Sequence, residues 1–284
     1  MAKTKVLVTV KTYPTLSQKY DELVCTAGFL EDGSWIRIYP MPFRKLDSGY
    51  KKWQWIELDL KKNESDKRKE SFRPYDYNKI AFGAEIDTKN EWAERKKYAY
   101  KKVYTNMDKL IEEAKDANIG TSLAVFKPTE IIDFLCKPCE RNWDEDKLKA
   151  IQARMRQGSL FETEEERKER QYFKVAEKIP YDFIYVFKSE NGKIHRMKII
   201  DWEVGRLYLR YVHQYKLSEK EACKKVKEKF FDDFAKKRDL HFFLGTTLQF
   251  HSLGRNPFLI IGTFTPPLPK FQEPSLFDLD FGND

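Results

Sequence analysis

Alternation of apolar and polar residues in three early segments is the feature that most restricts how this chain can fold. Val6, Val8 and Val10 share one side of the first segment, opposite a mostly polar side. Residues 23–39, which turn at Glu31-Asp32-Gly33, and residues 53–61 repeat this pattern. A period of two residues is typical of a strand with one buried face. The first third of the chain is therefore predicted to form a sheet with one aliphatic face.

Helix signals follow in blocks and do not alternate regularly with strands. Helices are predicted over residues 107–117 and 143–157, from an Asp201 cap, and from a Ser218–Glu221 capping box to about residue 237. Hairpins are predicted over residues 181–200, turning at Asn191-Gly192, and over residues 242–264. This segregation predicts an α+β fold with mostly antiparallel sheets and separate helices.

Charge divides the chain into parts of different character. Residues 1–104 hold 22 basic and 15 acidic side chains, whereas residues 105–284 hold 31 and 30, so the formal net charge of +8 lies almost wholly in the first third. We predict a basic, aromatic-rich α+β region over residues 1–161 and a second α+β region over residues 162–273, either separate or one unit with the first. Residues 274–284 read as an acidic tail.

Several classes of protein are disfavoured by what the sequence lacks. No apolar run reaches the roughly 18 residues of a membrane span, and the first residues lack a secretory signal, so we expect a cytoplasmic protein without a membrane partner. Cys136 and Cys139 have a zinc-like spacing without a second Cys or His pair, and reduced thiols at a helix end are the preferred interpretation. Nucleotide-binding glycine patterns are absent, and no cofactor is assigned.

The polar side of the predicted N-terminal sheet combines aromatic rings with cations. Its members are Lys11, Tyr13, Trp35, Arg37, Tyr39, Trp53 and Trp55, and Arg44 and Arg73 lie in neighbouring basic segments. Such a surface stacks on unpaired or flipped-out bases and binds phosphates. The alternative is that a helix from the later chain covers this face and the tryptophans belong to the core, since Trp is usually well buried.

Acidic and basic residues alternate at the end of the third segment. Glu57, Asp59 and Lys61 resemble the acidic-x-Lys element of metal-dependent nucleases, in which carboxylates bind Mg²⁺ or Mn²⁺ and the lysine helps to activate water. A solvated strand edge explains the same residues. These three residues are the candidate catalytic set if the protein is a nuclease-like hydrolase.

A second candidate metal set consists of His195, Asp201 and Glu203. One continuous strand would place the three side chains on a common face. The helix signal that begins at Asp201 interrupts that face, and an N-cap with a first-turn carboxylate is the favoured interpretation. No metal site is assigned.

Two short peptides resemble the sliding-clamp-binding motif of bacterial DNA-processing proteins. They are residues 157–161, Gln-Gly-Ser-Leu-Phe, and residues 273–277, which end in Ser275, Leu276 and Phe277. Such a peptide inserts its Leu and Phe into a pocket of the clamp. Both copies depart from the pattern, and five degenerate residues also arise by chance. The tail is the candidate partner-binding segment.

Four further segments are similar to those of an uncharacterised family of prokaryotic proteins. They are Lys-Thr-Tyr-Pro at 11–14, Cys-Thr-Ala-Gly at 25–28, Trp-Ile-Arg-Ile-Tyr-Pro at 35–40 with Pro-Phe-Arg at 42–44, and Asp-Trp-Glu-Val at 201–204. The resemblance spans most of the chain. It implies no established activity and no catalytic residues.

The sequence favours a nucleic-acid-binding protein of prokaryotic DNA processing or of antiviral and mobile-element defence. DNA and RNA both remain open. The alternatives are a metal-dependent nuclease or other nucleic-acid-modifying enzyme, and an adaptor that docks a sliding clamp or a defence-system protein through its tail.

Overall fold

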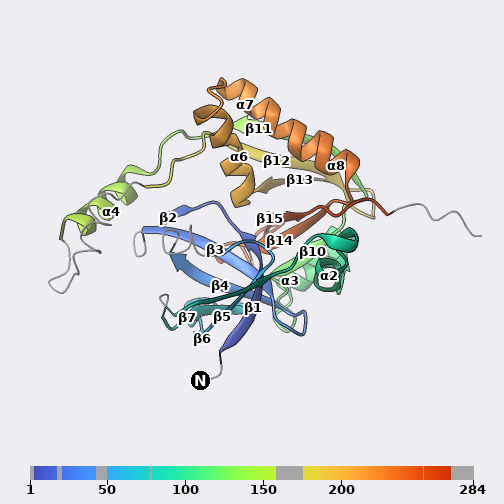
Figure 1. The fold of residues 1–284 in the computed structure, drawn as a ribbon, viewed down its shortest axis with the longest axis horizontal. Coiled ribbons are helices and arrows are strands. Elements are labelled where there is room, and N and C mark those ends of the chain that lie inside the picture. Colours follow the sequence, from blue (N-terminus) through green and yellow to red (C-terminus); the bar gives the residue numbers. More distant parts are fainter. Residues whose placement is uncertain are drawn as a thin grey trace, which may run out of the picture.

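Two β-sheets packed against each other form the body of the protein, and helices cover the outer side of the second sheet (Figure 1). The structure is a computed structural model that describes residues 3–17, 21–42, 50–76, 79–157, 175–251 and 253–269. Strands and helices occur in separate blocks, which confirms the predicted α+β fold.

The first sheet is built from residues 4–85. Its strands are β1 (Thr4–Lys11), β2 (Thr15–Ser17), β3 (Asp21–Phe29), β4 (Trp35–Pro42), β5 (Gln54–Leu58), β6 (Leu60–Lys62), β7 (Ser71–Pro74) and β8 (Ala81–Glu85). They lie in the order β6-β7-β4-β3-β1-β5-β8, with β2 beside β3. The predicted turn at residues 31–33 is confirmed, because β3 and β4 pair antiparallel around it.

Strand β1 is buried on both faces, although the sequence predicts only one aliphatic face. Val6 and Val8 contact one apolar cluster, and Leu7 and Val10 contact another. Thr9 is buried as well. The physical reason is that Leu7 and Val10 face β14 and β15 of the second sheet, whereas Val6 and Val8 pack against side chains from other strands of their own sheet, so both faces lose contact with water.

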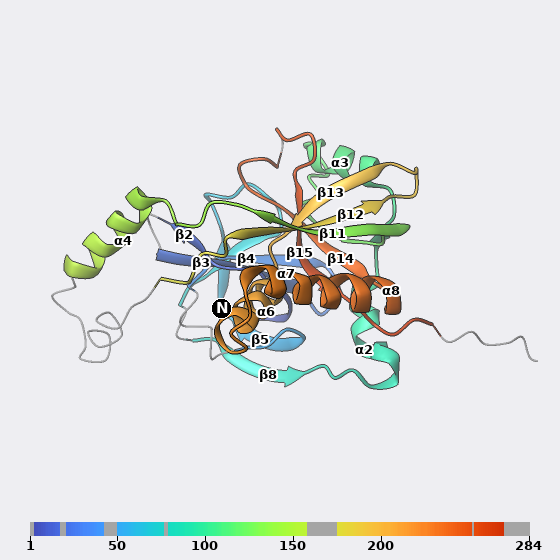
Figure 2. The same cartoon turned by 90° about the horizontal axis from the view of Figure 1, so that it is seen from above.

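The second sheet is built from residues 103–264. Its strands are β9 (Val103–Tyr104), β10 (Leu123–Phe126), β11 (Glu130–Pro138), β12 (Tyr181–Lys188), β13 (Ile194–Ile199), β14 (His241–Thr246) and β15 (Phe258–Phe264), in the order β11-β12-β13-β15-β14-β10-β9. The helices are α2 (Lys89–Ala99), α3 (Met107–Lys115), α4 (Glu145–Gln157), α6 (Trp202–His213), α7 (Glu219–Lys227), the π-helix η1 (Glu228–Asp233) and α8 (Phe234–Lys237). Viewed from above, α6, α7 and α8 lie over this sheet (Figure 2).

Side chains cap the starts of three helices, and two of these caps, Asp201 and Ser218, are the ones that the sequence predicts. Asn106 accepts bonds from two backbone N–H groups at the start of α3, and Asp201 accepts one from the Glu203 N–H at the start of α6. Ser218 and Glu221 form a complete capping box on α7. Each cap satisfies donors that lack a partner within the helix.

Both sheets are mixed, which corrects the prediction of mostly antiparallel sheets. The pairs β4–β7, β13–β15 and β9–β10 are parallel. A parallel pair needs a long crossover connection, and the chain between β13 and β15 supplies one through α6, α7 and α8. Turn signals in a sequence predict only antiparallel neighbours, so they do not predict these parallel pairs.

An aromatic core joins the two sheets. Phe243 of β14 contacts Trp35 and Trp53 of the first sheet, with ring centroids 5.6 and 6.2 Å apart. The same cluster contains Leu7, Phe29 and residues of α2. The predicted boundary at residues 161 and 162 lies outside the described residues, and β11 and β12, which flank it, pair within one sheet.

Candidate functional site: a cavity between the two sheets

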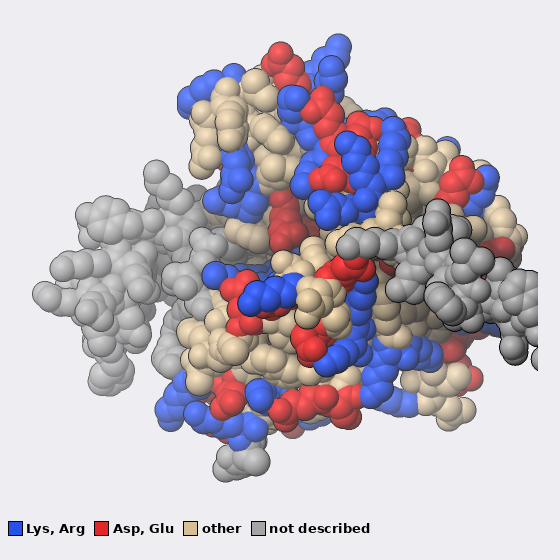
Figure 3. Space-filling view, turned by 45° about the vertical axis from the view of Figure 1, so that its right-hand side comes forward, with Lys and Arg blue, Asp and Glu red and all other residues tan. Residues whose placement is uncertain are grey.

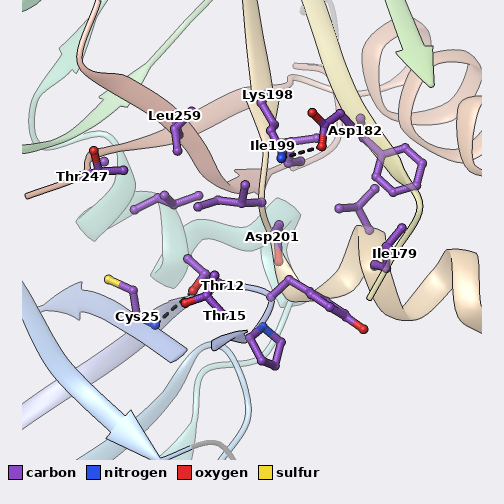
Figure 4. Close-up of a pocket in the computed structure, with 18 of the residues that line it drawn as sticks. Thr12, Thr15, Cys25, Ile179, Asp182, Lys198, Ile199, Asp201, Thr247 and Leu259 are labelled. Atoms are coloured by element: carbon purple, nitrogen blue, oxygen red, sulfur yellow. Dashed lines mark hydrogen bonds and ion pairs between the residues drawn. The ribbon is translucent and has the colours of Figure 1, made fainter. Parts of the chain in front are cut away.

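A cavity of about 370 Å³ lies where the first sheet meets β13, β15 and the start of α6. Figure 4 shows Thr12, Thr15 and Cys25 on the side of the first sheet, with Lys198 and Ile199 opposite them. Aliphatic and aromatic side chains form much of the remaining wall, among them Tyr13, Tyr39, Ile179, Phe183, Val204, Leu259 and Ile261. We call this space the inter-sheet cavity. Its volume and mixed lining are those of a site for a small organic group.

One end of the inter-sheet cavity holds a buried carboxylate. Asp201 is fully buried, and both of its oxygens accept hydrogen bonds from Lys52 Nζ, at 2.7 and 2.8 Å. Glu203 also lies 3.2 Å from that ammonium group. Burial raises the pKa of Asp201 to about 6, even though Lys52 acts in the opposite direction. Lys52 therefore links the turn before β5 to the N-terminus of α6.

Two buried arginines belong to a second wall. Arg37 is 1% exposed, and its guanidinium donates to Glu70 Oε1 at 2.9 Å and to Ser122 Oγ at 2.8 Å. Arg68 donates to both carboxylate oxygens of Asp66, and its remaining nitrogen donates to the Thr246 carbonyl. Both arginines connect the first sheet to the second. Their charges are already compensated inside the protein, so they hold the wall in place.

Tyr13 and α6 shape the cavity from another side. The Tyr13 ring stacks on Trp202 with centroids 5.5 Å apart, and its hydroxyl donates to the Glu177 carbonyl at 2.7 Å. A Cβ atom on Gly205 would lie 2.4 Å from the Tyr13 ring. Glycine at this position is therefore what allows α6 to approach the ring so closely.

Thr247 lines this site and carries a buried hydroxyl without a hydrogen-bond partner among the described residues. Among the described residues, four buried side-chain nitrogen or oxygen atoms have no hydrogen-bond partner, and Thr247 Oγ1 is the one whose residue lines the inter-sheet cavity. A buried hydroxyl without a partner costs about 1–3 kcal/mol. A ligand with a donor or an acceptor at this point would recover that cost.

Most of the predicted aromatic face lies in the core and not on the surface. Trp53 is 5% exposed, and Trp35 and Trp55 pack against the same cluster. Strands β14 and β15 cover this face, so the tryptophans are covered as in the alternative interpretation, but mainly by strands and not by the helix that it named. Lys11 donates to the Tyr50 carbonyl at 3.1 Å, and it does not line the cavity.

Three of the predicted binding residues, Tyr13, Arg37 and Tyr39, do line the inter-sheet cavity. Arg73 is half-buried on β7, and its Nε has no partner among the described residues. Arg44 lies outside the described residues. The structure thus brings these three residues of the predicted surface to the inter-sheet cavity and packs its tryptophans into or against the core.

The predicted catalytic residues Glu57, Asp59 and Lys61 do not share one continuous strand. Glu57 is exposed on β5, Asp59 lies between β5 and β6, and Lys61 lies on β6 over the Tyr75 ring. Within the described ranges, no group of three or more His, Cys, Asp or Glu is arranged to hold a metal ion. Mg²⁺ or Mn²⁺ is therefore not assigned to these side chains.

The remaining predicted motifs are also separated in space or undescribed. His195 bonds Ser189 Oγ at 2.8 Å, whereas Asp201 bonds Lys52, so these two do not form a ligand set. Cys136 lies on β11 and not at a helix end, and its thiol donates to the Cys223 carbonyl of α7 at 3.6 Å. Residues 158–161 of the first clamp-like peptide, and Ser275, Leu276 and Phe277 of the second, lie outside the described residues.

Lys52, Arg68 and Thr247 are the residues of this region that sequence reasoning did not single out. Lys52 and Asp201 are 149 positions apart, and Arg68 and Thr246 are 178 apart. The Asp-Trp-Glu-Val segment at 201–204 was the one local sequence signal for this site, because Asp201 is both the cap of α6 and the buried carboxylate of the cavity wall.

Comparison with known proteins assigns two family matches to the chain. Residues 2–101 match the family described as Domain of unknown function (DUF8758), which covers the first sheet. No curated protein matches the chain. In the part of the chain that the structure describes, no helix combines the length and the apolar character that crossing a membrane requires. Residues 103–280, which include the whole second sheet, match the family described as Domain of unknown function (DUF8757), and the chain belongs to that family.

Proposed function

We propose that this protein binds nucleic acid and holds one unstacked nucleobase in the inter-sheet cavity. The observation that carries the proposal is the combination, within about 370 Å³, of aromatic rings, aliphatic walls and a buried hydroxyl without a partner. Proteins that take a base out of its stack hold it between aromatic or apolar side chains and read its edge by hydrogen bonds. Tyr13 and Tyr39 offer rings, and Thr247 offers the free hydroxyl.

The location of the basic residues supports the same ligand. Lys62, Lys67 and Lys69 are exposed on or near β6 and β7, in the chain region that carries the excess positive charge. On the face seen in Figure 3, however, Lys and Arg lie among Asp and Glu and do not form one continuous basic surface. The formal net charge of +8 is also modest for 284 residues, so few phosphates should be neutralised and the affinity should depend on salt less steeply than in a strongly basic DNA-binding domain.

The test is a titration of labelled single-stranded and double-stranded oligonucleotides over a salt series. Tyr39→Leu removes a ring that lines the cavity, and Thr247→Val removes the free hydroxyl while keeping the side-chain shape. A stacking contact contributes about 1–3 kcal/mol, so Tyr39→Leu should weaken binding by about 5- to 150-fold. Tyr215→Leu, which changes a 63% exposed tyrosine beyond the end of α6, is the matched control.

Binding that Tyr39→Leu and Thr247→Val both leave unchanged would show that the cavity takes no part. If no oligonucleotide binds the parent protein at low salt, the proposed function itself is wrong. Urea unfolding of each variant separates a lost contact from a lost fold.

A second candidate function is modification of the captured nucleotide. It is favoured by Asp201, a buried carboxylate on the cavity wall whose pKa is raised toward neutrality by burial. A carboxyl group of this kind suits general acid–base catalysis. Incubation of oligonucleotides with and without Mg²⁺ or Mn²⁺, followed by product analysis by mass spectrometry, tests it. A product that forms with the parent and not with Asp201→Asn would support an enzyme, and unchanged oligonucleotides in every case would contradict it.

A further inference from the structure

The loop between β14 and β15 carries three large apolar side chains in contact with solvent. Leu248 is 50% exposed, Phe250 is 51% exposed and Leu253 is 84% exposed. In Figure 2 this loop extends outward from the ends of the two strands. Single exposed apolar residues are common, but three within six positions are an unusual concentration that points to an interaction site.

Hydrogen bonds hold this loop in a defined shape. Thr246 Oγ1 and His251 Nδ1 lie 3.0 Å apart, and the Gly254 N–H donates to the Phe250 carbonyl at 3.1 Å. At the far end, the Phe258 N–H donates to Asn256 Oδ1 at 3.0 Å. These bonds restrain the backbone of the described residues that carry Phe250 and Leu253, which lowers the entropy lost on binding.

The apolar loop begins at the wall of the inter-sheet cavity. Thr247 and Leu248, its first two residues, both line that cavity. The loop also lies next to a basic segment, because Arg68 donates to the Thr246 carbonyl and the flanking Lys67 and Lys69 are exposed. One end of the molecule thus combines a base-sized pocket, protruding apolar side chains and nearby cations.

We propose that residues 247–251 and 253–257 between β14 and β15 act as a wedge in double-stranded nucleic acid, with Phe250 and Leu253 entering the base stack. This inference rests on the proposed function, and it names the duplex as the partner of that site. Apolar wedges of this type unstack neighbouring bases, and a flipped base leaves a gap that such a side chain fills. The adjacent lysines would contact the phosphates on both sides of the gap.

The test uses a short duplex that contains the fluorescent base 2-aminopurine, together with its single strand and the same duplex carrying a central mismatch. The double variant Phe250→Ser/Leu253→Ser should bind the intact duplex at least about tenfold more weakly than the parent. It should also lose the fluorescence rise that accompanies unstacking. Binding to the single strand should be unchanged and binding to the mismatched duplex largely restored, because their bases need little or no opening.

Leu268→Ser is the matched control, since it replaces an exposed leucine (52%) that lies outside this loop. The wedge is refuted, and the cavity proposal survives, if the double variant opens the duplex as the parent does while Tyr39→Leu weakens binding. It is also refuted if the parent binds single strands alone. Loss of binding to anionic vesicles, or loss of self-association in light scattering, with duplex binding unchanged would assign the loop to a membrane or to a second copy. Absence of all oligonucleotide binding would overturn both proposals together.

Discussion

Replacing Lys52 by Met tests the claim that a buried ion pair joins the two sheets. The Lys52 side chain is 11% exposed and its partner Asp201 is fully buried, so neither charge is well hydrated. Removing one member of such a pair leaves an uncompensated buried charge, which costs about 3–5 kcal/mol unless the remaining carboxyl takes up a proton. Methionine keeps most of the aliphatic volume of lysine, so little of this loss would come from packing.

The sign of the pH dependence follows from Asp201. Its pKa in the folded protein is about 6, above the value of 3.8 for an unperturbed carboxyl, so folding favours the protonated form and the carboxyl reduces stability as the pH rises from about 4 to 6. Without the ammonium group, the pKa of Asp201 rises further. Above pH 6 the free energy of unfolding of the variant therefore continues to fall by about 1.4 kcal/mol per pH unit, whereas that of the parent no longer falls. The difference in stability between parent and variant should be larger at pH 7 than at pH 5.

Urea unfolding at pH 5 and pH 7, followed by tryptophan fluorescence, measures both quantities. The double variant Lys52→Met/Asp201→Asn removes the charge and retains an N-cap side chain for α6. It should recover a large part of the lost stability at pH 7. A single variant as stable as the parent, or a loss that is equal at the two pH values, would refute the view that Asp201 depends on Lys52.

Two further predictions concern the framework around the inter-sheet cavity. Burial tends to raise the pKa of Asp66, but hydrogen bonds from Arg68 and Ser71 outweigh it and lower the pKa to about 2. Its stabilising contribution of about 2 kcal/mol should therefore be complete above pH 4 and lost as the pH falls toward 2, and this acid loss should be absent in Asp66→Asn unfolding curves. Gly28→Ala places a Cβ atom 2.0 Å from the Leu7 carbonyl oxygen in the neighbouring strand, so it should lower the unfolding midpoint severely or abolish soluble expression, whereas Gly192→Ala, which meets nothing within 4 Å, measures only the strain of a positive φ.

Local motifs in this chain were predictable because their partners lie within a few residues. The caps at Asn106, Asp201 and Ser218 bond to backbone groups two or three positions ahead. The Asn191-Gly192 turn joins β12 to β13 as predicted, with Gly192 at a positive φ. These features depend on short-range sterics and hydrogen bonds, which the order of residues already contains.

The aromatic face illustrates what local reasoning could not decide. Alternation in β4 correctly separated Trp35 and Arg37 from Ile36 and Ile38, but it does not say which face meets water. The decision came from β14 and β15, more than 200 residues later, which supply Phe243 and Phe264 to cover the rings. A polar and aromatic strand face is compatible with a surface that binds nucleic acid and with a core. In the first case the rings stack on bound bases, and in the second they stack on other side chains.

Local patterns in the sequence were enough to predict the α+β class, the helix caps, the hairpins and the concentration of positive charge in the first third. Tertiary structure alone decided that the tryptophans are core, that Lys52 meets Asp201, and that Tyr13, Tyr39 and Thr247 surround one cavity. The physical reason is distance along the chain. Contacts between residues that are far apart in sequence arise from the packing of two sheets, and packing depends on every element at once.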